Sequence, residues 1–188
     1  MKKLLLLLCL FAAGASRAQN TPVSNEDFIN EVSKLIVDRS FPHYYLSVNS
    51  VHCSFKKFDY DEWYKYALNE DVPIYILNEL AKKSYGDAAP RNWQQQKLLN
   101  AICIDEEKSN SILSQSIKKH VKSGNKVVNK DNVVFYFSRP EFTGDYQYGI
   151  IDMGFRCDDQ QCGMGATFLF KYVNGKWKMV GRKLIWGN

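Results

Sequence analysis

Residues 146–186 read YQYGIIDMGFRCDDQQCGMGATFLFKYVNGKWKMVGRKLIW, and this stretch decides the fold. Apolar residues alternate with other residues through 146–157 and again through 164–173, which is the period of strands that bury one face. Asn174-Gly175 then gives a strong short-range signal for a hairpin turn, after which the chain runs back. The stretch therefore predicts an antiparallel meander of long strands.

Segments upstream of the meander predict helices. Ser24 with Asp27 resembles a capping box ahead of an amphipathic helix, and Asp71 followed by Pro73 begins another helix. A weaker helical pattern covers residues 109–120. Helices followed by a run of strands predict an α+β fold, in which N-terminal helices pack on the C-terminal antiparallel meander.

Other segments carry less regular signals. Asp59 or Asp61 begins a predicted short helix that carries Trp63. Residues 93–104 end in an apolar run that is typical of a strand, and residues 133–138 are rich in residues that favour strands.

The first residues have the pattern of a cleavable signal peptide. Lys2 and Lys3 precede an apolar run of about ten residues, which is too short to span a bilayer as a helix. Small side chains at Ser16 and Ala18 fit a signal peptidase site, so we expect residues 1–18 to be removed. The expected location is the periplasm or the extracellular medium, with no membrane span after cleavage; an uncleaved N-terminal anchor is the alternative.

Removal of the signal peptide changes the charge of the protein. The segment holds three basic residues and no acid, so the formal net charge falls from +5 to +2 for residues 19–188. This small excess gives no reason to expect nucleic acid as a partner. The remaining 170 residues suffice for one sizeable core, and we expect a single α+β domain over 19–188.

Four cysteines remain after cleavage, and an even number in an exported chain favours disulfides. Cys157 and Cys162 lie at the two ends of a turn between predicted strands, where paired strand ends bring Cα atoms close enough for a bridge. A disulfide between Cys53 and Cys103 then follows by elimination.

A metal site or a nucleophilic site is the alternative use of these cysteines. Asp158 and Asp159 lie inside the same turn, but no histidine is near in sequence and the turn supplies only half of a zinc ligand set. His52 adjoins Cys53, but neighbours on a strand point to opposite faces and do not form a catalytic pair. We therefore expect no metal and no cofactor.

Asp152 is the most interesting single residue of the predicted meander. It interrupts an apolar run, and the period of two places Tyr148, Asp152 and Arg156 on one face of the strand. If that face lines a pocket, Asp152 is a weak candidate for a general base and all three are weak candidates for ligand binding, with Arg156 as an anion anchor. In the alternative interpretation Asp152 pairs across the sheet with a cation such as Arg182.

The glycines and aromatic residues have simpler interpretations. Gly163 and Gly165 lack the spacing and the lysine of a phosphate-binding loop, and they open a strand; they relieve crowding or form a bulge. The large aromatic residues are most simply core residues, although an exposed platform for sugar or peptide is the alternative. These are Trp63, Tyr64, Tyr66, Trp177 and Trp186.

Four short stretches together resemble small uncharacterised exported proteins of Gram-negative bacteria. The resemblance covers about 50 residues of the C-terminal third and rests on residues 138–142, 148–151, 157–162 and 174–177. The order of helices before a curved sheet also resembles the NTF2-like and cystatin-like superfolds. Such superfolds host many unrelated functions, so the resemblance transfers no catalytic residue.

These patterns favour an exported binding or accessory protein without evident catalytic machinery. Its expected partner is a protein or a small-molecule ligand. One alternative is a small pocket enzyme of NTF2-like architecture that uses Asp152 as general base. Another is a secreted factor that acts through an exposed aromatic surface.

Overall fold

The computed structural model of the chain describes residues 23–50, 71–84, 92–123, 132–157 and 162–187. Its helices are α2 (Asn25–Ile36), α4 (Ile74–Ser84), η2 (Gln95–Lys97) and α5 (Glu106–Ser123). Its strands are β1 (Tyr44–Ser47), β2 (Ala101–Ile104), β3 (Val134–Phe137), β4 (Glu141–Phe142), β5 (Tyr148–Arg156), β6 (Gly163–Val173) and β7 (Lys176–Gly187). The predicted signal peptide, the predicted helix after residues 59–61 and the aromatic residues at 63–66 lie outside the described residues.

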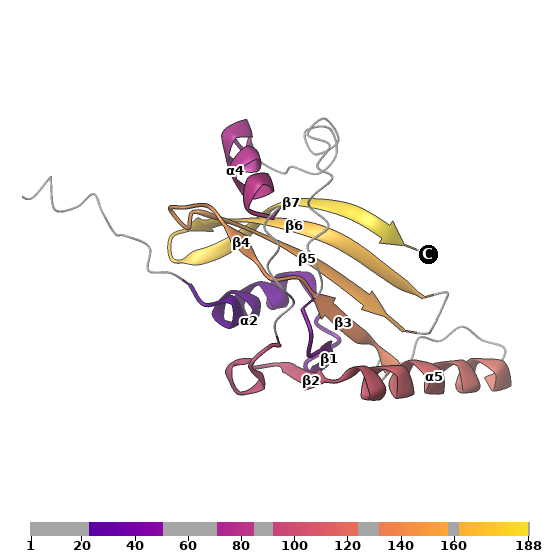
Figure 1. Cartoon of the computed structure of the whole chain (residues 1–188). Helices are drawn as coiled ribbons and strands as arrows, with labels where there is room; N and C mark the ends of the chain where they lie inside the picture. Colours follow the sequence, from indigo (N-terminus) through magenta and orange to yellow (C-terminus); the bar gives the residue numbers. More distant parts are fainter. Residues whose placement is uncertain (1–22, 51–70, 85–91, 124–131, 158–161, 188) are drawn as a thin grey trace, which may run out of the picture.

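The strands form one mixed sheet in the order β2-β1-β3-β5-β6-β7, with β4 beside β5 (Figure 1). The strands from β3 through β7 pair antiparallel, which confirms the predicted meander and the α+β class. Asn174 and Gly175 both have positive φ angles, 51° and 79°, as the predicted tight turn requires. β1 differs from the meander because it pairs parallel with both β2 and β3.

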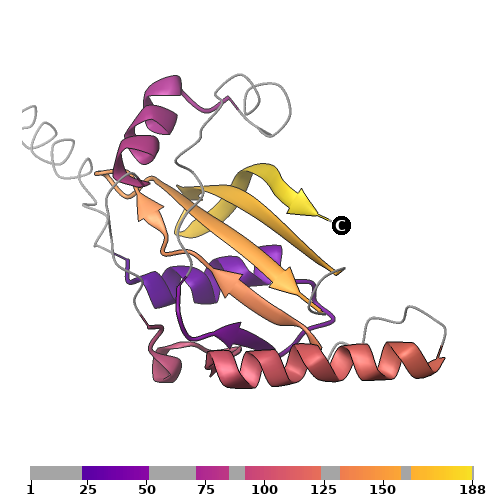
Figure 2. The ribbon, with the colours of Figure 1, turned by 45° about the vertical axis from the view of Figure 1, so that its right-hand side comes forward.

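Helix α2 packs on one face of the sheet (Figure 2). Ser24 caps it as predicted, because its hydroxyl accepts a hydrogen bond from the Asp27 backbone N–H at 3.1 Å. Phe28 is fully buried and contacts three aromatic rings edge-to-face at centroid distances of 4.9–5.6 Å. At the same place, the Trp177 backbone N–H donates to the Glu31 carboxylate at 2.7 Å. The first described helix is therefore fastened to the last hairpin.

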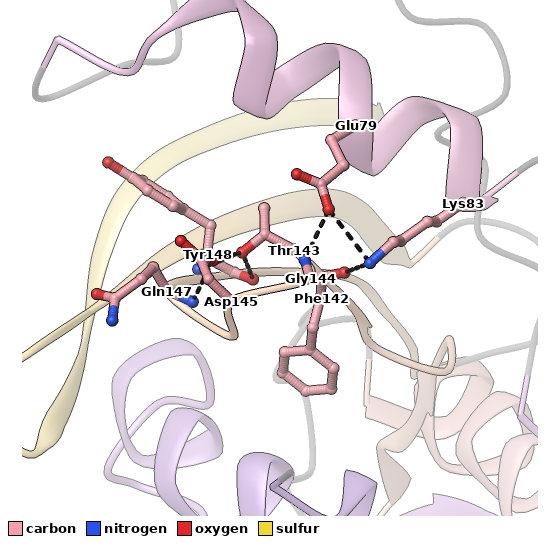
Figure 3. A network of polar contacts seen from close by, with 8 residues as sticks. All are labelled: Glu79, Lys83, Phe142, Thr143, Gly144, Asp145, Gln147 and Tyr148. Atoms are coloured by element: carbon pink, nitrogen blue, oxygen red, sulfur yellow. Dashed lines mark hydrogen bonds and ion pairs between the residues drawn. The ribbon is translucent and has the colours of Figure 1, made fainter. Parts of the chain in front are cut away.

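Helix α4 lies on the opposite face, where Leu77 and Leu80 pack against Ile150 and Leu169. Polar contacts fix it to the turn between β4 and β5 (Figure 3). Glu79 accepts a hydrogen bond from the Gly144 N–H at 2.6 Å. Lys83 donates to the Phe142 carbonyl at 2.6 Å and forms an ion pair with Glu79 at 3.3 Å. The turn itself is closed by Thr143, whose hydroxyl accepts from the Tyr148 N–H at 3.0 Å.

Candidate functional site

An apolar pocket of about 630 Å³ lies on the α2 face of the sheet, beyond the C-terminal end of the helix. Its size falls in the range of small-molecule sites in proteins, about 300–1,000 Å³. Most of its lining is aliphatic, aromatic or sulfur-containing, as shown by Ile36, Phe135, Met153, Phe155, Met164 and Leu184. Leu184 is 59% exposed, so it lies at the edge of the pocket, whereas Phe135 and Met153 are buried in its floor.

The strands build this pocket through their two-residue alternation. Met153 and Phe155 share one face of β5, in line with the predicted alternation, and Cys157 follows the strand and also lines the pocket. Met164 lies directly opposite Phe155 on β6. Helix α2 covers the floor only as far as Ile36, because the helix ends there. The sheet beyond that point is left uncovered by α2 and forms the pocket.

The disulfide between Cys157 and Cys162 forms one wall of the pocket and confirms the predicted pairing. The two Cα atoms are 5.3 Å apart, and the Cys157 N–H donates to the Cys162 carbonyl at 3.2 Å. Cys157 and Cys162 are thus joined to each other and do not serve as thiolate ligands for a metal. Within the described ranges, no group of three or more His, Cys, Asp or Glu side chains is placed to hold a metal ion.

Cys103 has no disulfide partner among the described residues. Burial raises the pKa of this thiol, and the negative charge of Glu26 adds to the shift, so the thiol stays protonated at neutral pH. Cys53, the partner predicted for Cys103, lies outside the described residues, and their pairing stays a prediction.

A second, more polar pocket of about 420 Å³ adjoins the first. Both pockets are lined by Asp38 and Phe41, which belong to the turn between α2 and β1. The turn is closed by two hydrogen bonds to Asp38, whose carboxylate accepts from the Ser40 N–H at 2.7 Å and whose carbonyl accepts from the Phe41 N–H at 2.9 Å. Lys34 and Arg39 also line this second pocket and are exposed.

Tyr44 forms part of the wall of the smaller pocket. Burial raises the pKa of its hydroxyl, so the side chain is uncharged at neutral pH. Its ring contacts Phe135, a floor residue of the larger pocket, at a centroid distance of 5.2 Å. The linings of the two pockets are therefore joined by this aromatic contact.

Asp152 lies on the face of the sheet opposite the apolar pocket, because its neighbour Met153 points into that pocket. The Asp152 side chain is buried at 5% exposure, and its Oδ1 accepts a hydrogen bond from the Thr167 hydroxyl at 2.5 Å. Arg182, the cation expected to pair with Asp152, lies opposite Phe168 and so belongs to the other face. Asp152 pairs across the sheet with Thr167 on β6, and Thr167 pairs in turn with Lys183 on β7. Lys183, and not Arg182, is therefore the cation on the same face as Asp152.

Tyr148, Asp152 and Arg156 share one face of β5 as predicted, but they do not converge. Each is four residues from the next, and a strand rises about 3.3 Å per residue, so their Cα atoms are roughly 13 Å apart along the strand. Tyr148 lies beneath the Lys171 ammonium group at 5.8 Å, and Arg156 lies over the Tyr136 ring at 5.9 Å. The predicted trio is therefore spread along the strand and engages three separate sets of neighbours.

The residues that sequence reasoning missed are those of the turn between α2 and β1. The only sequence pattern in residues 38–42 is Pro42, which indicates the end of a helix. It does not indicate which part of the sheet lies beneath the turn. The sequence predicted that the large aromatic residues lie in the core, with an exposed platform as the alternative. Trp177 is buried in the core, whereas Trp186 is 42% exposed.

Comparisons of the chain with protein-family models, with curated proteins and with solved structures found no match in any of the three. The resemblance to exported bacterial proteins and to NTF2-like or cystatin-like folds therefore stays a prediction. In the part of the chain that the structure describes, no helix is both long and apolar enough to cross a membrane.

Proposed function

We propose that this chain is an exported binding protein that holds an apolar small molecule in the larger pocket and performs no chemical step of its own. The observation that carries the proposal is the pocket of about 630 Å³, with its apolar lining and disulfide-bonded wall. Ligand sites are typically pockets of this size with predominantly apolar walls. Asp38 is the one charged residue among the described residues that line it.

Export is the second part of the proposal. The intramolecular disulfide between Cys157 and Cys162 supports it, because disulfides persist in oxidising compartments and are rare where thiols are kept reduced. The N-terminal pattern of residues 1–18 supports it independently.

The placement of Asp152 favours binding over catalysis at this pocket. Its carboxylate faces away from the pocket and is engaged by Thr167. A general base must come within hydrogen-bond reach of the proton that it removes. A ligand in the apolar pocket would lie on the far side of the sheet from that carboxylate.

The test is the binding of N-phenylnaphthylamine, an uncharged dye that fluoresces in apolar surroundings, followed by its displacement with straight-chain alkanols. Burial of each methylene contributes about 0.8 kcal/mol, so affinity should rise by up to about fourfold per methylene and level off once the pocket is full. Dye that does not bind, or alkanols that fail to displace it, would contradict the proposal.

Two variants locate the binding. Leu184→Arg places a charge at the edge of the pocket and should weaken dye binding at least about tenfold, because the ligand would have to desolvate the guanidinium group. Ile102→Arg is the matched control, since Ile102 is 47% exposed on β2 and does not line the pocket. Equal binding by both variants would place the dye elsewhere.

A further inference from the structure

We propose that the ligand is an amphiphile with an anionic group: its apolar chain fills the larger pocket, and its anionic group is held by Lys34 and Arg39 in the smaller one. This inference rests on the proposed function, because it names the class of ligand that the apolar pocket binds. The shared chemistry is a single apolar chain that ends in a carboxylate or a phosphate.

The two pockets adjoin, and the proposed ligand would enter both. Asp38 and Phe41 line both of them, so the pockets meet at the turn between α2 and β1. The Phe41 ring packs edge-to-face on Phe135 at a centroid distance of 5.6 Å. A molecule that leaves the apolar floor at Phe135 passes Phe41 and then reaches the polar residues of the smaller pocket.

The charges differ between the two pockets. Among the described residues that line them, the larger pocket has no cation and the smaller one has two, Lys34 and Arg39. Both cations are exposed, and Asn100 lines the same pocket. This arrangement pairs an apolar compartment with a cationic one, which is the complement of an anionic amphiphile.

Two features oppose an anion at this position, and they limit the expected effect. Asp38 contributes a negative charge, although one of its oxygens accepts the hydrogen bond from the Ser40 N–H. The C-terminal end of α2 carries a partial negative charge, which Lys34 in the last turn offsets. The two cations outnumber the one acid, and exposed charge pairs of this kind change affinity by up to about fivefold each.

The test compares decanoate with decanol, at concentrations below those at which they form micelles, as competitors for N-phenylnaphthylamine bound to the whole protein. The two compounds have the same chain and differ in the anionic group. We expect decanoate to bind about fivefold more tightly than decanol at low ionic strength and to lose this advantage at high salt. Decyl phosphate in parallel distinguishes a phosphate group from a carboxylate.

Paired variants assign the effect to the smaller pocket. Lys34→Gln with Arg39→Gln should reduce decanoate affinity to that of decanol and leave decanol unchanged. Lys82→Gln with Lys176→Gln removes the same charge from exposed positions outside both pockets and should change neither. Asp38→Asn should act in the opposite direction and strengthen decanoate binding, because it removes the opposing charge and keeps an oxygen for the Ser40 N–H.

The outcomes separate this inference from the proposed function. Equal binding of decanoate and decanol, or unchanged decanoate binding in the Lys34 and Arg39 variant, would overturn the anionic group while the apolar site stands. Tighter binding of decyltrimethylammonium than of decanoate would overturn it as well. Failure of the dye and of every decyl compound to bind would overturn the proposed function itself.

Discussion

At the scale of single residues, Gly163 and Gly165 show how the sheet makes room for a large side chain. A Cβ atom at Gly163 would lie 2.9 Å from the ring of Trp186, and Gly165 and Gly154 meet the same indole. The close approach of Trp186 fits the predicted relief of crowding, and the register shift beside Gly165 places its extra residue on β7, at Ile185, and not at the glycines. Trp186 thus packs across a strip of glycine backbone.

Glu141 on β4 is a residue whose replacement should change the stability of the fold. Burial raises the pKa of its carboxyl group, and the nearby charges of Arg139 and Lys83 offset only part of that shift. The ionised form is therefore less favourable in the folded protein than in the unfolded chain. Glu141→Gln should raise the free energy of unfolding at neutral pH.

The pH dependence of this gain has a defined sign. An acid whose folded pKa is raised contributes stability below its unfolded pKa, and that contribution is lost as pH rises through the folded pKa. The advantage of the Gln variant should therefore be largest above the folded pKa and vanish below the unfolded one. Urea denaturation across that range measures it, and a variant that is less stable than the parent at neutral pH would contradict the argument.

At the scale of elements, the two outer strands of the sheet are protected from pairing with other chains by different means. The side-chain amide of Gln95 donates to the Ala101 carbonyl at 2.8 Å and accepts from the Cys103 N–H. One side chain thus takes the place of a neighbouring strand along the outer edge of β2. β7 instead carries four basic residues and two register shifts, which are both common protections of sheet edges.

Gln95→Ala should expose the edge of β2. Loss of two hydrogen bonds should lower the free energy of unfolding by about 1–3 kcal/mol, and the freed backbone groups should promote self-association at high concentration. Gln94→Ala is the matched control, because the Gln94 side chain makes no capping hydrogen bond at the start of η2. Urea denaturation and sedimentation velocity measure both effects; identical behaviour of the two variants would show that Gln95 does not protect the edge.

The sequence predicted the long elements and missed the way they enclose a site. β5, β6 and β7 follow from their alternation and from Asn174-Gly175, because both signals are local. The four residues of β1 are too few to show a period, and their parallel pairing joins residues that are distant in sequence. The pocket depends on which turn lies beside the exposed end of the sheet, and that information is tertiary.

At the scale of the whole molecule, export predicts the mass of the mature protein. Protein recovered from the producing cell should begin at Gln19 and lack the mass of residues 1–18. The Cys157–Cys162 disulfide should lower the mass by two hydrogen atoms, and the predicted pairing of Cys53 with Cys103 would double that deficit. Intact-mass spectrometry without reductant measures both, and a chain that retains residue 1 would contradict cleavage of the signal peptide and favour the uncleaved anchor.

The hydrogen bond between Glu31 and Trp177 has a consequence for the order of events during synthesis. It joins residues 146 positions apart, and the ring of Phe28 packs on the same tryptophan. Contacts of such sequence separation form late, because a long loop must close before they form. A nascent chain therefore cannot complete its core until the hairpin of β6 and β7 has left the ribosome, so helix α2 waits for most of the described chain before it finds its place.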